Sequence, residues 1–128
     1  MRIVSYTRDH LPGVLTLCRE EGWPTFVADP DRAHRALVAP GVTTVVVLQG
    51  DDVVGLAQLQ SDGEVQAHLS LLVVAQSFRR QGFGRQLLHE ALKNAGGIRV
   101  DLVTETGDKF YESLRHKSLK GYRVYPDE

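Results

Sequence analysis

The sequence has little cysteine and no long hydrophobic run, and both shortages narrow what the protein can be. Cys18 is the only cysteine among 128 residues, which excludes an internal disulfide and any metal site built from several cysteines. No stretch approaches the roughly 18 consecutive apolar residues of a membrane span. The N-terminal MRIVSYTRDH also lacks the apolar core of a signal peptide. We therefore expect a cytoplasmic protein without a membrane partner.

The chain also has no large excess of positive or negative charge. The 15 Lys and Arg residues nearly balance the 16 Asp and Glu residues, and the formal net charge is −1. Without a net positive field the chain has no general means of holding extended nucleic acid, so we expect no nucleic-acid partner. The hydrophobic content of 42% is that of an ordinary globular protein. At this length we expect one domain over residues 1–128.

Metal and covalent chemistry find little support. The histidines have no spacing typical of a common metal site, so we expect no metal. Cys18 lies in an apolar helical pattern, and we interpret it as a buried structural thiol. A covalent acyl intermediate on this thiol is therefore not expected.

Hydrophobic periodicity predicts an α/β chain with the element order β-α-α-β-β-β-α-β-α-β. An antiparallel meander that feeds one β-α-β crossover makes a mixed, mostly antiparallel central sheet with helices on both faces. The expected strands are 2–6, 42–49, 53–60, 65–75, 98–104 and, as a last edge strand, 121–126; the expected helices are 9–22, 29–41, 82–97 and 108–115.

The stretch FRRQGFGRQLL (78–88) connects an apolar strand to an amphipathic helix. A helix N-terminus has unpaired backbone N–H groups, and the glycines Gly82 and Gly84 let an anion approach the backbone closely. Arg79, Arg80 and Arg85 add charged donors at the same place. The stretch therefore predicts a cradle for a diphosphate, with a turn carrying solvated arginines as the alternative.

Two familiar phosphate-binding motifs do not fit this loop. The Rossmann fingerprint needs a third glycine where this chain has Leu87, and a P-loop needs Gly-Lys-Ser/Thr where Arg85 and Gln86 follow Gly84. RNA binding through the same stretch is disfavoured, because aromatic residues are sparse and the net charge is negative. The diphosphate interpretation therefore rests on the position of the loop between strand and helix.

The spacing Arg79-x-x-Gly82-x-Gly84, after LLVVAQSF and before RQLL, resembles the acyl-CoA-binding motif of the GNAT superfamily of N-acetyltransferases. The likeness extends over nearly the whole chain, from the early helix pair to the late FYESL. The stretch AHLSLLVVAQSFRRQGFG (67–84) is particularly similar to arylalkylamine N-acetyltransferases, which have a second histidine where this chain has Ser70. The resemblance implies a GNAT-like fold and an acetyl-CoA-dependent N-acetyltransferase in which a primary amine attacks the thioester directly.

The resemblance also assigns residues to coenzyme A. It implies that the backbone amides of the glycine loop bind the diphosphate. It further implies a bulge that splays the fourth strand from the strand 98–104, so that the exposed edge of the fourth strand pairs with pantetheine. The residues expected to hold the coenzyme are Leu72, Val74, Arg79, Arg80, Gln81, Gly82, Phe83, Gly84 and Arg85.

Acetyl transfer to an amine benefits from an acid for the leaving thiolate and a base for the amine. Tyr111, in DKFYESL, resembles the GNAT tyrosine near the coenzyme sulfur and is the expected acid; simple packing on the sheet is the alternative. His68 is the expected base, with Glu64 as second candidate and a structural histidine as alternative. Strict alternation would put His68, Ser70 and Leu72 on one face, where Ser70 would orient His68 or a water molecule.

The acceptor pocket is implied by the resemblance at EGWPTFVADPD (21–31). Trp23 and Phe26 would line it, and Glu20 or Glu21 would attract a cationic amine. Trp23 would equally serve to fill the edge of the core. The acceptor is thus expected to be a small-molecule or protein amine, whose identity the sequence does not specify.

Three departures from the family pattern keep a second function open. Ser70 replaces a histidine, Thr104 and Glu105 stand where the family often has an Asn that contacts the coenzyme, and RHKSLK separates FYESL from Gly121. The alternative is a non-catalytic acyl-CoA-binding sensor or interaction module. The short terminal strand also predicts an incomplete sheet edge, which a second copy would pair with to form a homodimer.

Overall fold

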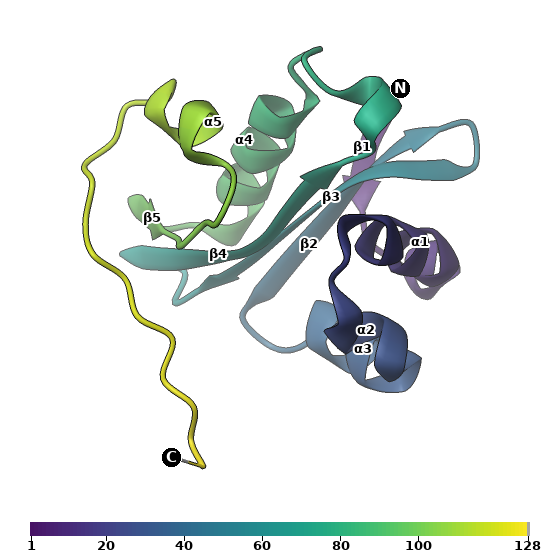
Figure 1. Ribbon diagram of the computed structural model, residues 1–128, viewed down its shortest axis with the longest axis horizontal. Coiled ribbons are helices and arrows are strands. Elements are labelled where there is room, and N and C mark those ends of the chain that lie inside the picture. Colours follow the sequence, from purple (N-terminus) through teal and green to yellow (C-terminus); the bar gives the residue numbers. More distant parts are fainter. Residues whose placement is uncertain (128) are drawn as a thin grey trace.

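The computed structural model, which describes residues 1–127, is built around a five-stranded sheet with helices on both faces (Figure 1). The strands follow the order of the sequence across the sheet; neighbours are antiparallel except β4 and β5, which are parallel. The mixed, mostly antiparallel sheet expected from the sequence is therefore confirmed. The strands are β1 (Arg2–Ser5), β2 (Val42–Gln49), β3 (Asp52–Ser61), β4 (Gln66–Val74) and β5 (Arg99–Asp101).

The helices divide between the two faces of the sheet. One face is covered by α1, α2 and α3, and the other by α4 (Figure 1). Within residues 1–127, no helix combines the length and apolar character needed to cross a membrane. The helices are η1 (Arg8–His10), α1 (Leu11–Glu21), α2 (Pro24–Ala28), α3 (Pro30–Leu37), η2 (Gln76–Phe78), α4 (Phe83–Ala95) and α5 (Asp108–Glu112), η denoting a 3₁₀ helix.

Each face of the sheet has its own hydrophobic cluster, and β2 contributes to both. Val46 and Leu48 pack toward α1 and α3, whereas Val45 and Val47 pack toward α4, where Leu87 is fully buried. Alternate residues of a strand point to opposite faces, which explains why β2 contains consecutive apolar residues. The uninterrupted apolar run within β2 is Val45–Leu48, and there the sheet is buried on both sides.

Local signals set most helix limits as expected, but α3 ends at Leu37 and not next to Gly41, since Pro40 disfavours helical backbone in the residue before it. The Asp29 side chain accepts a hydrogen bond from the Arg32 backbone N–H at 3.1 Å, so the predicted N-cap of α3 is confirmed. Helix α1 ends at Gly22, whose φ of 77° is left-handed. The short helix α2 was not expected, because the sequence analysis treated 21–31 as a connection; Pro24 at its first position was the available signal.

A β-bulge interrupts β4 at Ser70. Gln58 of β3 pairs with Leu71, but the next residue, Leu59, pairs with Leu69, which leaves Ser70 without an opposite residue. An extra residue in one strand reverses the alternation of side chains beyond it and bends the strand. The bulge expected in the fourth strand is therefore present.

The bulge changes which residues share a face. Leu69 and Leu72 both pack on the α4 side, whereas Leu71 packs on the α1 side. His68, next to Leu69 in the regular part of β4, points to the α1 side. The expectation that His68 and Leu72 share a face is wrong, because strict alternation was carried through a bulge.

Two expectations for the end of the chain are also wrong. Strand β5 spans Arg99–Asp101 rather than 98–104, and it pairs with only Gln66–His68 of β4. Residues 121–126 form no strand, and Tyr122 and Val124 are each 82% exposed. Their alternation is that of a strand, but nothing in the described chain supplies a neighbour for it. The segment instead runs past the β4–β5 end of the sheet (Figure 1).

Candidate functional site

The glycine loop enters α4 through two left-handed residues. Arg80 has a φ of 63° and Gly82, the residue before the helix, has a φ of 88°. An added Cβ on Gly82 would meet nothing within 4 Å, so the requirement for glycine here is conformational and the space beside the helix end is open. A left-handed Arg80 costs backbone strain of roughly 1–3 kcal/mol, which is typical of functional loops.

The backbone amides at the start of α4 are available to a ligand. The first hydrogen bond of the helix is donated by the Gln86 N–H to the Gly82 carbonyl at 3.1 Å. The backbone N–H groups of residues 80–85 have no hydrogen-bond acceptor within the described chain. No side chain caps the helix at Gly82. Unpaired amides at the positive end of a helix dipole form an anion-binding surface. The loop therefore presents unpaired backbone amides at the start of α4, as the predicted cradle requires.

Gly84 has a role that the sequence analysis missed. A Cβ on Gly84 would lie 3.3 Å from the Phe110 ring, so this glycine allows α5 to pack closely on the first turn of α4. Arg85 crosses the same junction, and its Nη2 donates to Ser113 Oγ at 3.3 Å. The second glycine of the loop therefore positions α5 against the helix end.

Arg79 is fixed by protein contacts. Its Nε donates to the Val74 carbonyl at 2.8 Å, and its guanidinium forms an ion pair with Glu21 at the end of α1. Arg80, by contrast, is exposed and makes no hydrogen bond or ion pair within residues 1–127. Arg79 thus holds the loop against α1 and pairs with Glu21, one of the two carboxylates expected to attract an amine.

The edge of β4 beyond the bulge faces away from β3. The Ala75 N–H donates to the Val54 carbonyl of β3 at 2.8 Å. In an antiparallel pair successive residues direct their N–H and C=O groups to opposite sides, so those of Leu72 and Val74 point outward. Since β5 pairs only with Gln66–His68, this outward edge has no neighbouring strand. The Val74 carbonyl is used by Arg79, and the remaining groups of the edge stay open.

A large cleft of about 1320 Å³ lies between α4, β5, α5 and the segment that follows α5. Arg85, Leu102 and Tyr111 are among the residues that line it. Tyr111 is half-buried, its ring packs edge-on against Phe110 with centroids 5.0 Å apart, and burial raises the pKa of its phenol. The phenol is therefore kept protonated and able to donate.

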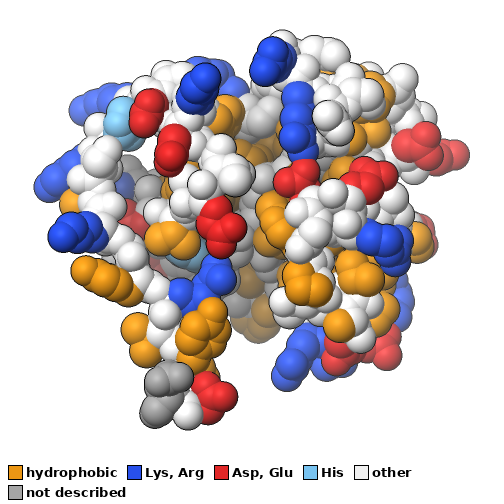
Figure 2. All heavy atoms as spheres, viewed as in Figure 1, with side chains coloured by type: hydrophobic (Ala, Val, Ile, Leu, Met, Phe, Trp, Pro, Cys, Tyr) orange, Lys and Arg blue, Asp and Glu red, His pale blue; other side chains and the backbone are white. Residues whose placement is uncertain are grey.

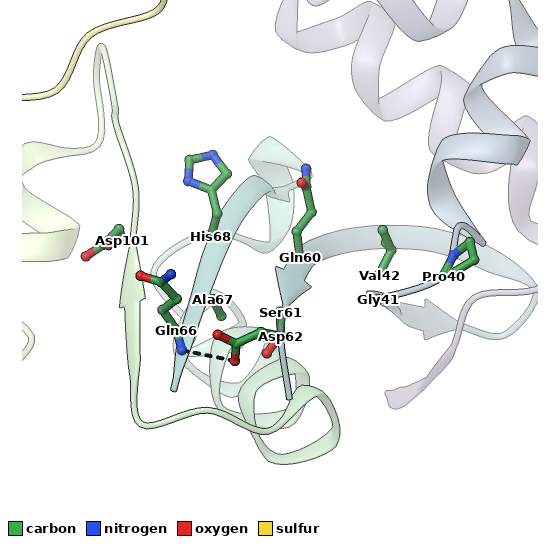
Figure 3. Close-up of a pocket in the computed structure, with 10 residues that line it drawn as sticks. All are labelled: Pro40, Gly41, Val42, Gln60, Ser61, Asp62, Gln66, Ala67, His68 and Asp101. Atoms are coloured by element: carbon green, nitrogen blue, oxygen red, sulfur yellow. Dashed lines mark hydrogen bonds between the residues drawn. The ribbon is translucent and has the colours of Figure 1, made fainter. Parts of the chain in front are cut away.

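A smaller cavity of about 500 Å³ lies on the α1 side of the sheet (Figure 3). Its floor is a row across four strands, in which Val42 pairs with Gln60, Gln60 with His68, and His68 with Asp101. His68 and Gln60 project to the same side from adjacent strands (Figure 3). The two cavities share two lining residues, His68 and Asp101, at the point where β4 and β5 separate.

Two of the predicted acid–base contacts differ from expectation. Ser70 Oγ accepts from Gln60 Nε2 at 2.7 Å, and His68 makes no side-chain hydrogen bond within the described residues. Glu64 is exposed in the β3–β4 turn, where its N–H donates to Asp62 Oδ1 at 2.8 Å, and it lines neither cavity. Of the two base candidates, the structure therefore brings only His68 to the cavities.

Trp23 and Phe26 lie away from both cavities. Each is half-buried and packs against the hydrophobic cluster on the α1 side of the sheet. Gln60 and Asp101, which the sequence analysis did not consider, stand in the floor of the smaller cavity instead. The available signal was Asp101 itself, a carboxylate inside the otherwise apolar strand pattern IRVDLVT.

Cys18 lies apart from the two cavities. Cys18 is buried in α1, lines neither cavity, and burial raises the pKa of its thiol. Its predicted burial is confirmed. Within residues 1–127, no group of three His, Cys, Asp or Glu side chains is arranged to hold a metal ion.

Comparison with known proteins places the fold. The family described as acetyltransferase (GNAT) domain matches residues 6–118. A GNAT-family acetyltransferase from Streptococcus pneumoniae is 29% identical, with a TM-score of 0.77 over 99% of this chain and 98% of that chain. The aminoglycoside N-acetyltransferase AAC(6')-Iy, solved with CoA, is 20% identical with a TM-score of 0.77 over 97% and 92%. A Trypanosoma brucei acetyltransferase is 20% identical with a TM-score of 0.75 over 97% of each chain.

The two likenesses at 20% identity establish the fold alone. No curated protein matches the sequence.

Proposed function

The chain belongs to the GNAT acetyltransferase family, and we propose that it transfers the acetyl group of acetyl-CoA to a primary amine by direct attack. The observation that carries the proposal is the meeting of two cavities at His68 and Asp101. Direct transfer requires two substrates to approach from different sides and to meet at one point. The large cleft would hold the coenzyme, and the smaller cavity would hold the amine.

The glycine loop, which reaches the cleft at Arg85, and the nearby edge of β4 have groups that fit a coenzyme A molecule. The open amides of residues 80–85 suit a diphosphate, and Arg80 and Arg85 supply positive charge beside them. The outward edge of β4 at Leu72 and Val74 offers backbone groups that suit the amides of pantetheine. Gln81, Gly82, Phe83 and Gly84 complete the proposed diphosphate loop, with Arg79 as the residue that holds it in place.

Tyr111 is the proposed acid. The amine nitrogen would attack the thioester carbonyl carbon, and the C–S bond would break as the tetrahedral intermediate collapses. The leaving sulfur would take the Tyr111 phenol proton, which a phenol holds at neutral pH even at its ordinary pKa of about 10. Of the two protons that an ammonium loses on becoming an amide, one would restore the phenol.

His68 is the proposed base for the other proton. It lies in both cavities, beside the point where the strands part, and its side chain is exposed. Ser70 would act indirectly, because its hydrogen bond to Gln60 fixes the residue opposite His68. Replacement of His68 by Gln should lower kcat by about a hundredfold, the typical contribution of a general base, with little change in acetyl-CoA affinity.

A small-molecule amine is the proposed acceptor. The fold relative AAC(6')-Iy is an aminoglycoside N-acetyltransferase, and the cavity of about 500 Å³ has the size of a small-molecule site. Trp23 and Phe26, which lie away from both cavities, would then pack against the core and not contact the acceptor.

The test is an assay of acetyl-CoA with a panel of primary amines, following free thiol and the acetylated amine together. The proposal predicts that both appear in equal amounts with at least one amine. Tight acetyl-CoA binding without thiol release on any amine would instead identify a non-catalytic acyl-CoA-binding module.

A second copy of the chain is the proposed partner for the outer edge of β5. This edge has no neighbour in the described chain, and Ile98 and Val103 beside it are 80% and 52% exposed. Light scattering after size-exclusion chromatography should give a dimer mass. A monomer mass at all concentrations would contradict it.

A further inference from the structure

We propose that the smaller cavity selects polar amines that carry at least two positive charges, with Asp101 as the residue that binds the second charge. The proposal rests on the proposed function, because it names the class of acceptor for the same site. It places the acceptor in the cavity beside β4 and not at Trp23 and Phe26.

The lining of the cavity contains acidic residues but no Lys or Arg. None of its ten lining residues is Lys or Arg, whereas Asp62 and Asp101 are both among them. An oligoamine or amino sugar would meet attraction there. Backbone hydrogen bonds have the largest effect in lowering the pKa of the Asp62 carboxyl, and Arg99 of β5, the nearby fixed cation, helps to lower it. A neutral or apolar amine would gain little, because Gln60, Gln66 and Ser61 make much of the remaining wall polar.

The two carboxylates differ in the hydrogen bonds that they already accept within the protein. Asp62 Oδ1 accepts three backbone N–H groups, from Glu64, Val65 and Gln66, at 2.8, 2.8 and 3.3 Å. Asp62 therefore shapes the β3–β4 turn. Asp101 makes no hydrogen bond or ion pair within residues 1–127 and is exposed at the end of β5. Asp101 is the carboxylate free to bind a cation.

The position of Asp101 fits an anchor beside the reacting nitrogen. It is the parallel-strand partner of His68, the proposed base, and both residues line both cavities. Neighbouring strands are about 5 Å apart. An amine with a second cation a few bonds from the first would therefore present one nitrogen near His68 and the other near Asp101.

The surface around the site carries charges of both signs. Figure 2 shows this face hollowed between the C-terminal segment and the α1–α3 side, with acidic and basic side chains around the hollow. The proposed selectivity therefore rests on Asp101 within the cavity and not on the surrounding surface.

The experiment titrates ¹⁵N-labelled full-length protein with spermidine, and separately with butylamine as the matched monoamine. Spermidine should shift the amide signals of residues 41–42, 60–62, 66–68 and 99–101. Asp101→Asn should weaken spermidine binding roughly twofold to fivefold, the value of one exposed charge pair, and leave butylamine unaffected. Asp51→Asn, in the β2–β3 turn outside both cavities, is the control and should bind spermidine as the wild type does.

The outcomes separate this proposal from the proposed function. Spermidine shifts outside the cavity, or equal spermidine affinity in wild type and Asp101→Asn, would overturn the assignment even if the enzyme acetylates amines. Binding in the cavity that depends on Asp101 would uphold it even if no thiol is released. The spectra also show directly whether the Asn variant keeps the fold.

Discussion

The two halves of β4 differ, although they belong to one continuous strand. Before the bulge, Ala67 and His68 pair with both β3 and β5, and His68 belongs to the row across the sheet that forms the floor of the smaller cavity. After it, Leu71–Val74 pair only with β3 and lead toward the open amides of α4. The first half of β4 forms part of the floor of the smaller cavity, and the second half is a free edge of the sheet.

The difference lies in a single extra residue, Ser70. A bulge bends a strand and reverses its alternation, so the same strand serves two sites on two sides of the sheet. The proposed acetyl transfer takes place where these halves meet. The predictions that follow act on one half or the other.

The largest expected effect is that of Tyr111→Phe on the coenzyme side. Loss of the phenol should lower kcat about a hundredfold, while the acetyl-CoA dissociation constant stays nearly constant. Tyr122→Phe is the matched control, because that ring is 82% exposed. Steady-state kinetics provide the measurement, and an unchanged kcat would remove Tyr111 from the mechanism.

Gly82→Val should weaken coenzyme binding at the loop that follows β4 and leave the smaller cavity unchanged. A β-branched residue at a φ of 88° is strained and should displace the loop amides, weakening acetyl-CoA binding roughly tenfold to thirtyfold. Gly50→Val is the control: its φ is 59° and its surroundings are equally open, but it lies in the β2–β3 turn. Calorimetric titration should show a loss of affinity only for Gly82→Val. Equal affinity in both variants would contradict the diphosphate cradle.

Ser70→Ala acts at the bulge that separates the two halves of β4. It removes the acceptor of the Gln60 side chain, which should cost about 1 kcal/mol of unfolding free energy. Because Gln60 stands opposite His68, kcat should fall severalfold while acetyl-CoA affinity is kept. Urea denaturation and kinetics measure the two effects, and a change in coenzyme affinity alone would contradict this division of roles.

The smallest expected effect concerns alkaline pH. Burial raises the pKa of the Tyr111 phenol, so the unfolded chain releases this proton at a lower pH than the folded chain. Its contribution to stability is complete below about pH 10, the usual phenol value, and is lost as pH rises further. Tyr111→Phe should therefore lose less unfolding free energy between pH 9 and 11 than the wild type. Equal losses would indicate that the phenol is not shielded from water.

Much of the framework could be predicted from the sequence, because it depends on local patterns. The strand Val42–Gln49, the Asp29 cap and the glycine loop before α4 all have direct signals in neighbouring residues. Phe110 against Gly84 has none, since it depends on where α5 docks.

The floor of the smaller cavity was missed for a related reason. The run LSLLVV is apolar on both sides of the bulge, so nothing in it shows where alternation reverses. The row that joins Gln60, His68 and Asp101 exists only once three distant segments are in register. The prediction of a strand at 121–126 was wrong for a different reason: the residues alternate as in a strand, but alternation alone does not supply a neighbouring strand to pair with.

The central claim is that the coenzyme and amine sites adjoin at His68 and Asp101. It is tested most directly by the affinity of a bisubstrate compound in which coenzyme A is joined through an acetyl bridge to spermidine. If the two cavities adjoin, isothermal titration should show binding at least about a hundredfold tighter than that of coenzyme A, since the second contact becomes intramolecular. Binding no tighter than that of coenzyme A alone would contradict the claim.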